Sequence, residues 1–157
     1  MSSKPALIVC AALLAASLAG AAEQGFLLLS PREYQSELTA RAAPGARLIP
    51  KAADFNAPTI TVVKPDAHGP IQPPVDIDVR FQPAQGATVN ISTLRIMYGF
   101  LKLDITRRIL GAPGVQVSAD GLRASGAQLP SGDHKLIIEV ADNVGRTARQ
   151  TLEFSVK

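Results

Sequence analysis

The stretch Val75-Asp76-Ile77-Asp78-Val79-Arg80-Phe81 decides the fold, because apolar residues occupy its odd positions and charged residues its even positions. Side chains of a β-strand point alternately to the two faces of a sheet, so this stretch predicts a strand with one buried face and one solvated face. In a helix with 3.6 residues per turn the same apolar residues would be spread around the axis. The stretch therefore predicts a sheet that packs one face against another layer.

Similar alternation recurs throughout residues 58–157, between clusters of Pro, Gly, Asp and Asn. Residues 59–63 fit an edge strand, and residues 102–106 and 115–118 fit two short strands with a loop between them. Asp142-Asn143-Val144-Gly145 predicts a hairpin turn. The pattern predicts an all-β sandwich of about seven strands. The further side chains expected to face its core are Ile60, Val62, Leu94, Ile96, Tyr98, Leu136, Ile138, Val140, Leu152, Phe154 and Val156.

The N-terminal segment is organised like a secretory signal peptide. Lys4 supplies a positive start, residues 6–18 are apolar, and Ala19-Gly20-Ala21 places small residues before a cleavage point. We therefore expect a signal peptide over residues 1–21 and a periplasmic or secreted protein. The alternative is an uncleaved membrane anchor, since residues 25–29 are also apolar, and membrane association is expected only through this segment.

Cysteine content and charge exclude several classes of protein. Cys10 is the single cysteine and lies inside the predicted signal peptide, so the mature chain would have no disulfide, thiolate metal site or cysteine nucleophile. Removal of residues 1–21 would take away one of 16 basic residues and none of the 13 acidic ones, leaving a net charge of about +2. This small, dispersed charge predicts no nucleic-acid partner.

Residues 22–57 are rich in Ala, Pro and Arg and lack alternation, which predicts a tether. Within it, Ser30-Pro31-Arg32-Glu33 has the capping-box order of a helix N-terminus, and we expect a short helix over residues 31–42. Tyr34 and Leu38 would share one face of it. An isolated helix of this length is marginal in water, so we expect it to fray, with docking on the domain or on a partner as alternatives.

Four segments occur in the order found in bacterial immunoglobulin-like (Ig-like) repeats: Val89-Asn90-Ile91-Ser92-Thr93-Leu94-Arg95-Ile96, Asp104-Ile105-Thr106, Leu129-Pro130-Ser131-Gly132-Asp133-His134 and Val140-Ala141-Asp142-Asn143-Val144-Gly145-Arg146-Thr147. Residues 58–157 thus resemble an Ig-like domain, which implies a single antiparallel Ig-like β-sandwich. Such modules occur in adhesins, envelope proteins and accessory domains of enzymes, so the resemblance implies a binding or structural role with an envelope protein or a glycan as partner.

The strand order and the final Phe154-Ser155-Val156 also resemble the periplasmic copper-carrier sandwich, which makes a copper carrier the alternative function. That family uses an N-terminal His with further His or Met ligands, whereas the available residues here are His68, His134 and Met97. A metal site needs three or four convergent ligands. We expect both histidines to lie in solvated turns, and we expect no metal site and no cofactor.

Catalytic patterns are weak in this sequence. Asp76 and Asp78 share one strand face about 6.6 Å apart by strand rise, a separation used by glycosidases, but Arg80 continues the same wet row. No Gly-x-Ser-x-Gly elbow and no phosphate-binding glycine loop occurs. We therefore expect no enzymatic activity and no catalytic residues.

Tyr98-Gly99-Phe100-Leu101 places two large apolar residues just beyond a glycine, with Arg107 and Arg108 close behind. Loops that present apolar and Arg side chains are frequent anchors for partners, so Phe100, Leu101, Arg107 and Arg108 are the candidate partner-contact residues. In the alternative, Phe100 and Leu101 fold back to cap the open end of the sandwich. Together these patterns predict an exported cell-envelope module that binds or supports another molecule without catalysis.

Overall fold

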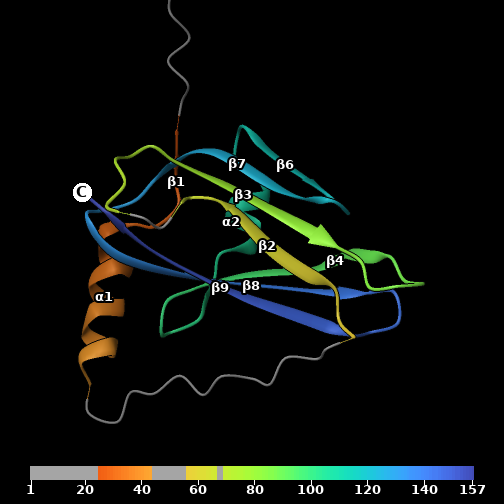
Figure 1. Cartoon of the computed structure of the whole chain (residues 1–157). Helices are drawn as coiled ribbons and strands as arrows, with labels where there is room; N and C mark the ends of the chain where they lie inside the picture. The colour runs from red at the N-terminus through yellow and green to blue at the C-terminus, as the bar shows by residue number, and fades with distance from the viewer. Residues whose placement is uncertain (1–24, 44–55, 67–68) are drawn as a thin grey trace, which may run out of the picture.

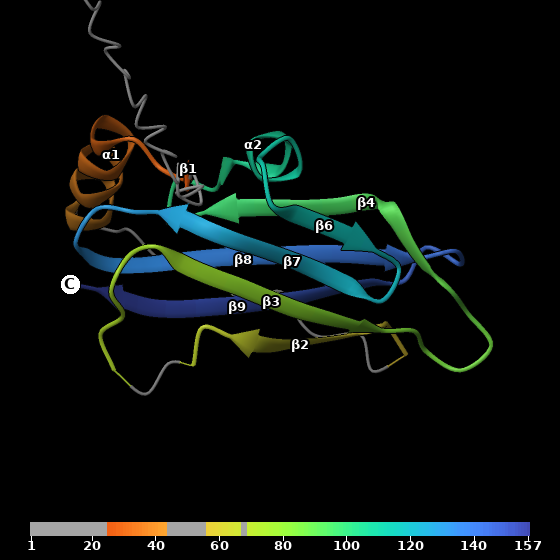
Figure 2. The same cartoon turned by 90° about the horizontal axis from the view of Figure 1, so that it is seen from above.

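The computed structural model describes residues 25–43, 56–66 and 69–157. These residues form two sheets that face each other, with a helix at one end of the sandwich and a shorter helix along one side (Figures 1 and 2). The predicted signal peptide, residues 1–21, lies outside the described residues, and so does His68. No helix among the residues described is long and apolar enough to cross a membrane.

The first sheet has the order β1-β7-β3-β2, with β6 paired to β7. Its strands are β1 (Phe26–Leu27), β2 (Thr59–Lys64), β3 (Val75–Gln82), β6 (Val115–Ser118) and β7 (Gly121–Gln128). The second sheet has the order β5-β4-β8-β9, with strands β4 (Val89–Tyr98), β5 (Leu103–Asp104), β8 (Gly132–Asp142) and β9 (Thr147–Val156). All strand pairs are antiparallel except β1 with β7.

The two sheets confirm the predicted all-β sandwich. Among the described residues, seven strands have four or more residues and two strands have two, which agrees with about seven strands. In β3 the four odd-numbered apolar side chains are buried, while Asp76 and Arg80 are exposed. Of the eleven further side chains predicted to face the core, ten are buried, and Val62 is partly buried against the core. Period-two alternation therefore places the core correctly in both layers.

Strand β7 was missed by the sequence prediction, although it lies inside its sheet. Its inward side chains are Leu122 and the small Ala124 and Ala127, and alanine has a low preference for strands. Ala127 and Ala124 pair with Val75 and Ile77, so two residues of β7 lie opposite one residue of β3 and β7 contains a β-bulge. The bulge breaks the period of two, which explains why alternation did not reveal this strand.

Helix α2 (Thr106–Leu110) was also missed, where the sequence suggested a strand followed by a loop. It follows β5 of one sheet and precedes β6 of the other, along one side of the sandwich. Ile105 and Ile109 are both buried. The N-cap residue, Ile105, makes no side-chain cap bond, although the Asp104 Oδ1 accepts the Thr106 N–H at 2.9 Å. A single turn with an apolar N-cap residue leaves little local signal, and burial of the two isoleucines stabilises it.

The segment from Phe26 to α1 (Pro31–Ala42) packs on the sandwich. Leu28 and Leu29 are fully buried, and α1 has the predicted bounds and the predicted capping box between Ser30 and Glu33. Helix α1 lies across the end of the sandwich where β9 also ends (Figure 1). This corrects the expectation of a fraying tether for residues 25–43, because the apolar residues that precede α1 are part of the core.

Candidate functional site

A cavity of about 560 Å³ lies between α1 and the adjoining end of the four-stranded sheet. Helix α1 contributes Glu37, Leu38 and Arg41, and the turn after β4 contributes Gly99 and Phe100. The first residues of β8, the last residues of β9, and Gly69 and Pro70 complete the wall. Among the side chains that line it are the rings of Tyr98, His134 and Phe154 and the charged groups of Asp133, Lys135 and Glu153.

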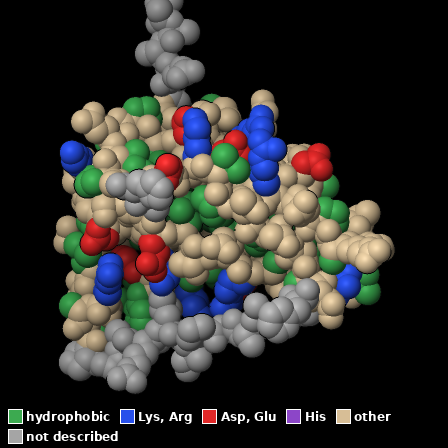
Figure 3. All heavy atoms as spheres, in the orientation of Figure 1, with side chains coloured by type: hydrophobic (Ala, Val, Ile, Leu, Met, Phe, Trp, Pro, Cys, Tyr) green, Lys and Arg blue, Asp and Glu red, His purple; other side chains and the backbone are tan. Residues whose placement is uncertain are grey.

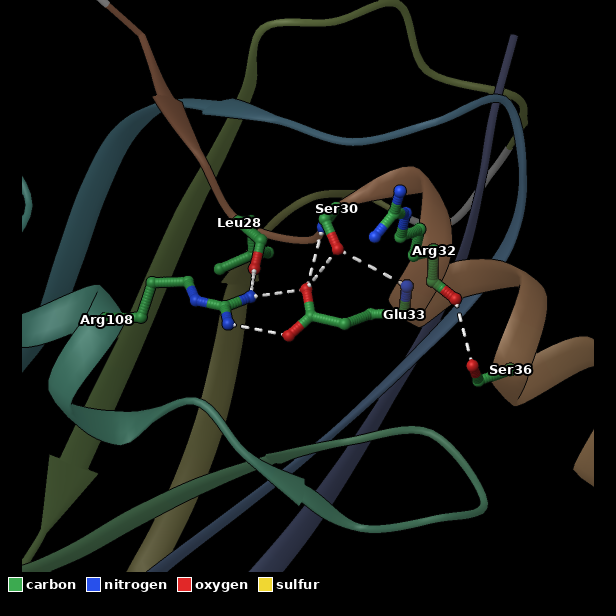
Figure 4. A network of polar contacts seen from close by, with 6 residues as sticks. All are labelled: Leu28, Ser30, Arg32, Glu33, Ser36 and Arg108. Carbon is green, nitrogen blue, oxygen red and sulfur yellow. Dashed lines mark hydrogen bonds and ion pairs between the residues drawn. The ribbon is translucent and has the colours of Figure 1, made fainter.

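Glu33 fastens the first turn of α1 to the sandwich (Figure 4). Its Oε2 accepts hydrogen bonds from the backbone N–H and the hydroxyl of Ser30, at 2.9 and 2.8 Å. The Arg108 guanidinium binds both Glu33 carboxylate oxygens, at 2.9 and 2.7 Å, and donates to the Leu28 carbonyl oxygen at 2.8 Å. These bonds, chiefly those from Arg108, lower the pKa of Glu33 to about 2. The pairing joins α1 to α2.

Glu37 fastens the middle of α1 to the turn after β4. Its side chain is buried, and its two carboxylate oxygens accept the backbone N–H groups of Phe100 and Leu101. Gly99 adopts φ +68° and lies so close that a Cβ there would overlap the Glu37 carboxylate. Successive N–H groups at a turn with one left-handed residue form a concavity that binds anions. Glu37 fills such a concavity.

His134 is buried, which corrects the expectation of a solvated turn. Its Nε2 lies 2.8 Å from the Pro130 carbonyl oxygen, which can only accept, so Nε2 carries the proton. The Nδ1 atom therefore accepts the hydrogen bond from the Tyr98 hydroxyl at 2.6 Å. Burial lowers the pKa of His134 and raises the pKa of Tyr98. The pair is neutral near pH 7, with both ring nitrogens in use.

The structure separates the residues considered as metal ligands. Met97 pairs with Ile137 and faces outward, whereas His134 belongs to the inward series of β8 that includes Leu136. His134 and Met97 therefore lie on opposite faces of the same sheet. No group of three or more His, Cys, Asp or Glu side chains within the described part of the chain is arranged to hold a metal ion.

The two aspartates considered as a catalytic pair each have a basic partner. Asp76 lies 3.4 Å from the Lys64 Nζ, and Asp78 lies 3.4 Å from the Arg123 Nε. These ion pairs hold the carboxylates on the solvated face of the five-stranded sheet.

The four candidate partner-contact residues lie in two places beside α1. Phe100 is half-buried and lines the cavity, as the capping alternative expects, whereas Leu101 is 53% exposed. Arg107 is exposed, but Arg108 is held by Glu33. Contact with a partner therefore stays a prediction for all four residues, and Arg108 also has a role within the fold. The burial of Glu37 and the cavity were not predicted from the sequence, because the residues on a helix face do not indicate which part of the protein the helix packs against.

We expect the free energy of unfolding to fall as the pH is lowered below about 6.5. The unfolded chain protonates His134 near that pH, whereas burial lowers the pKa of His134 in the fold. Between the two pKa values the unfolded state binds more protons, so stability is lost by up to about 1.4 kcal/mol per pH unit. Urea unfolding of the purified protein between pH 5 and 7.5 measures this slope.

The variant that tests this slope is His134→Gln, and its matched control is His68→Gln. The first variant should flatten the pH dependence of stability between pH 5 and 6.5, whatever its absolute stability. The second should keep the wild-type slope. An unchanged slope in His134→Gln would show that another group controls the pH dependence.

Comparison with known proteins adds little to this site. No family model matches the sequence, and no curated protein matches it either. Among solved structures, CopC from Methylosinus trichosporium OB3b matches over 63% of this chain and 94% of its own chain. The identity is 15% and the TM-score is 0.38, so this match assigns no function to the chain.

Proposed function

We propose that this chain is an exported Ig-like module that binds an envelope protein through the cavity between α1 and the four-stranded sheet. The observation that carries the proposal is the cavity itself, about 560 Å³, with aromatic rings within and charged side chains such as Arg41 and Lys135 around it. Protein-recognition surfaces commonly place aromatic side chains beside charged ones. The predicted signal peptide and the resemblance to the motif order of Ig-like repeats support an envelope location.

The chemistry of the cavity favours recognition over reaction. Glu37 and His134 are the groups best suited to move a proton, and both make their hydrogen bonds inside the fold. Lys135 and Glu153 are likewise paired, at 2.6 Å. On the face shown in Figure 3, acidic and basic side chains are interspersed rather than gathered by sign. Such a mixed surface suits a protein partner with complementary charges.

Capture from envelope extract, followed by a measured affinity for the captured protein, tests the proposal. Arg41→Glu and Phe100→Ala each alter the cavity and should weaken binding at least about fivefold, equivalent to about 1 kcal/mol. Arg80→Glu is the matched control, because Arg80 is exposed on β3 of the other sheet and should leave affinity unchanged. Equal affinities for all variants would exclude the cavity as the binding site.

A further inference from the structure

We propose that the backbone N–H pair of Phe100 and Leu101 is a carboxylate-binding site, which Glu37 fills in this structure and which a carboxylate of a protein partner takes when α1 moves away. The inference rests on the proposed function and names the chemistry of the partner. In this proposal, α1 covers the surface to which the partner would bind.

The site is built by the turn after β4. Gly99 donates its own N–H to the Lys135 carbonyl oxygen at 2.9 Å, which ties the turn to β8. With φ +68° at Gly99, the next two N–H groups point to the same carboxylate, one to each oxygen. Hydrogen bonds to an ionised carboxylate are stronger than those between neutral groups, so the pair selects an anion. The turn is part of the sandwich, and none of its residues comes from α1.

Helix α1 is attached by one aromatic side chain and two carboxylates. Among its residues only Tyr34 and Glu37 are buried, and Leu38 is 38% exposed. Tyr34 packs in the core beside the His134 ring, with ring centroids 5.2 Å apart. The third attachment is the ion pair between Glu33 and Arg108, whose side chains are 27% and 37% exposed. Elements that bury few apolar side chains open at lower free energy than the core does. Helix α1 is therefore the element of this end that a partner can displace most easily.

The spacing of Glu33 and Glu37, whose carboxylates attach α1 to the sandwich, defines the chemistry of the partner. Glu33 and Glu37 are four residues apart, so they lie one above the other on the same face of α1. A partner that replaces α1 must offer one carboxylate to the N–H pair of the turn and a second to Arg108. A helical segment with two acidic residues at positions i and i+4 meets both requirements.

Acetate provides a test of the carboxylate site on the purified mature chain, without any partner. Glu37→Ala leaves the N–H pair of Phe100 and Leu101 without its acceptor, and acetate should then bind there. We expect saturating acetate to raise the Tm of this variant by about 3–6 °C over chloride at equal ionic strength and pH 7, from binding linkage. The backbone amide NMR signals of Phe100 and Leu101 should shift with the same saturation. Wild-type protein, with Glu37 in place, should show neither effect.

Glu37→Ser is the second variant, since it keeps a small polar side chain if Glu37→Ala folds poorly, and it should respond to acetate in the same way. Identical Tm values in acetate and chloride, with unmoved amide signals in the folded variant, would overturn the carboxylate site. Failure of the proposed function is detected by a different measurement, in which the cavity variants and the control bind a captured protein with equal affinity. A peptide helix with glutamates at i and i+4 should bind Glu37→Ala more tightly than the same peptide with glutamines, and equal binding would exclude this partner chemistry.

Discussion

Replacing Leu28 by Ala is expected to lower the free energy of unfolding by about 2–5 kcal/mol, as for other fully buried leucines. Leu28 has no exposed surface and belongs to the common core, although it precedes the region that alternates. Its backbone also takes part, since its N–H donates to the Gln128 carbonyl at 3.0 Å and its own carbonyl accepts from Arg108. The loss combines missing apolar transfer energy with the cavity left behind. Urea unfolding of the mature chain measures it.

Leu27→Ala is the matched control, because the neighbouring side chain is 55% exposed. Its free energy of unfolding should change by no more than about 0.5 kcal/mol, as for most surface substitutions. Leu27 is the last residue of β1 and Leu28 follows it, and both variants lose the same side-chain atoms. The two variants therefore differ only in the burial of the leucine that is replaced. Equal stabilities would mean that residues 26–29 do not belong to the core.

The strands with strict alternation could be predicted because burial of one face imposes a period of two on the sequence. Helix α1 could be predicted for another reason, since the capping box of Ser30 and Glu33 is a local hydrogen-bonding pattern. Both signals are contained within a few neighbouring residues. The two-sheet architecture and the bounds of α1 follow from them directly.

The docking of α1 could not be predicted, because it depends on contacts between distant segments. Glu37 meets Phe100 and Leu101, which are 63 and 64 residues away, and nothing near Glu37 indicates a buried carboxylate. The burial of His134 did leave a signal. Its position continues the inward series of Leu136 and Ile138 by a step of two, although the preceding Ser-Gly-Asp resembles a turn.

Gly99→Ala is expected to destabilise the fold by about 3–5 kcal/mol, the second large effect. Alanine in the left-handed region costs about 1–2 kcal/mol, and Gly99 adopts φ +68°. The new Cβ would also overlap the Glu37 carboxylate. Because hydrogen bonds hold that carboxylate against the turn, it must leave two N–H donors, and hydrogen bonds to charged groups contribute about 1.5–3 kcal/mol.

Gly86→Ala separates these two causes. Gly86 has φ +74°, close to that of Gly99, but a Cβ there would meet nothing within 4 Å, so its substitution should cost only the backbone strain. In a chain that already carries Glu37→Ala, the effect of Gly99→Ala should shrink to that of Gly86→Ala, because the displaced carboxylate is gone. If Gly99→Ala costs the same with and without Glu37, the turn is strained by its backbone alone and the contact with α1 contributes nothing to stability.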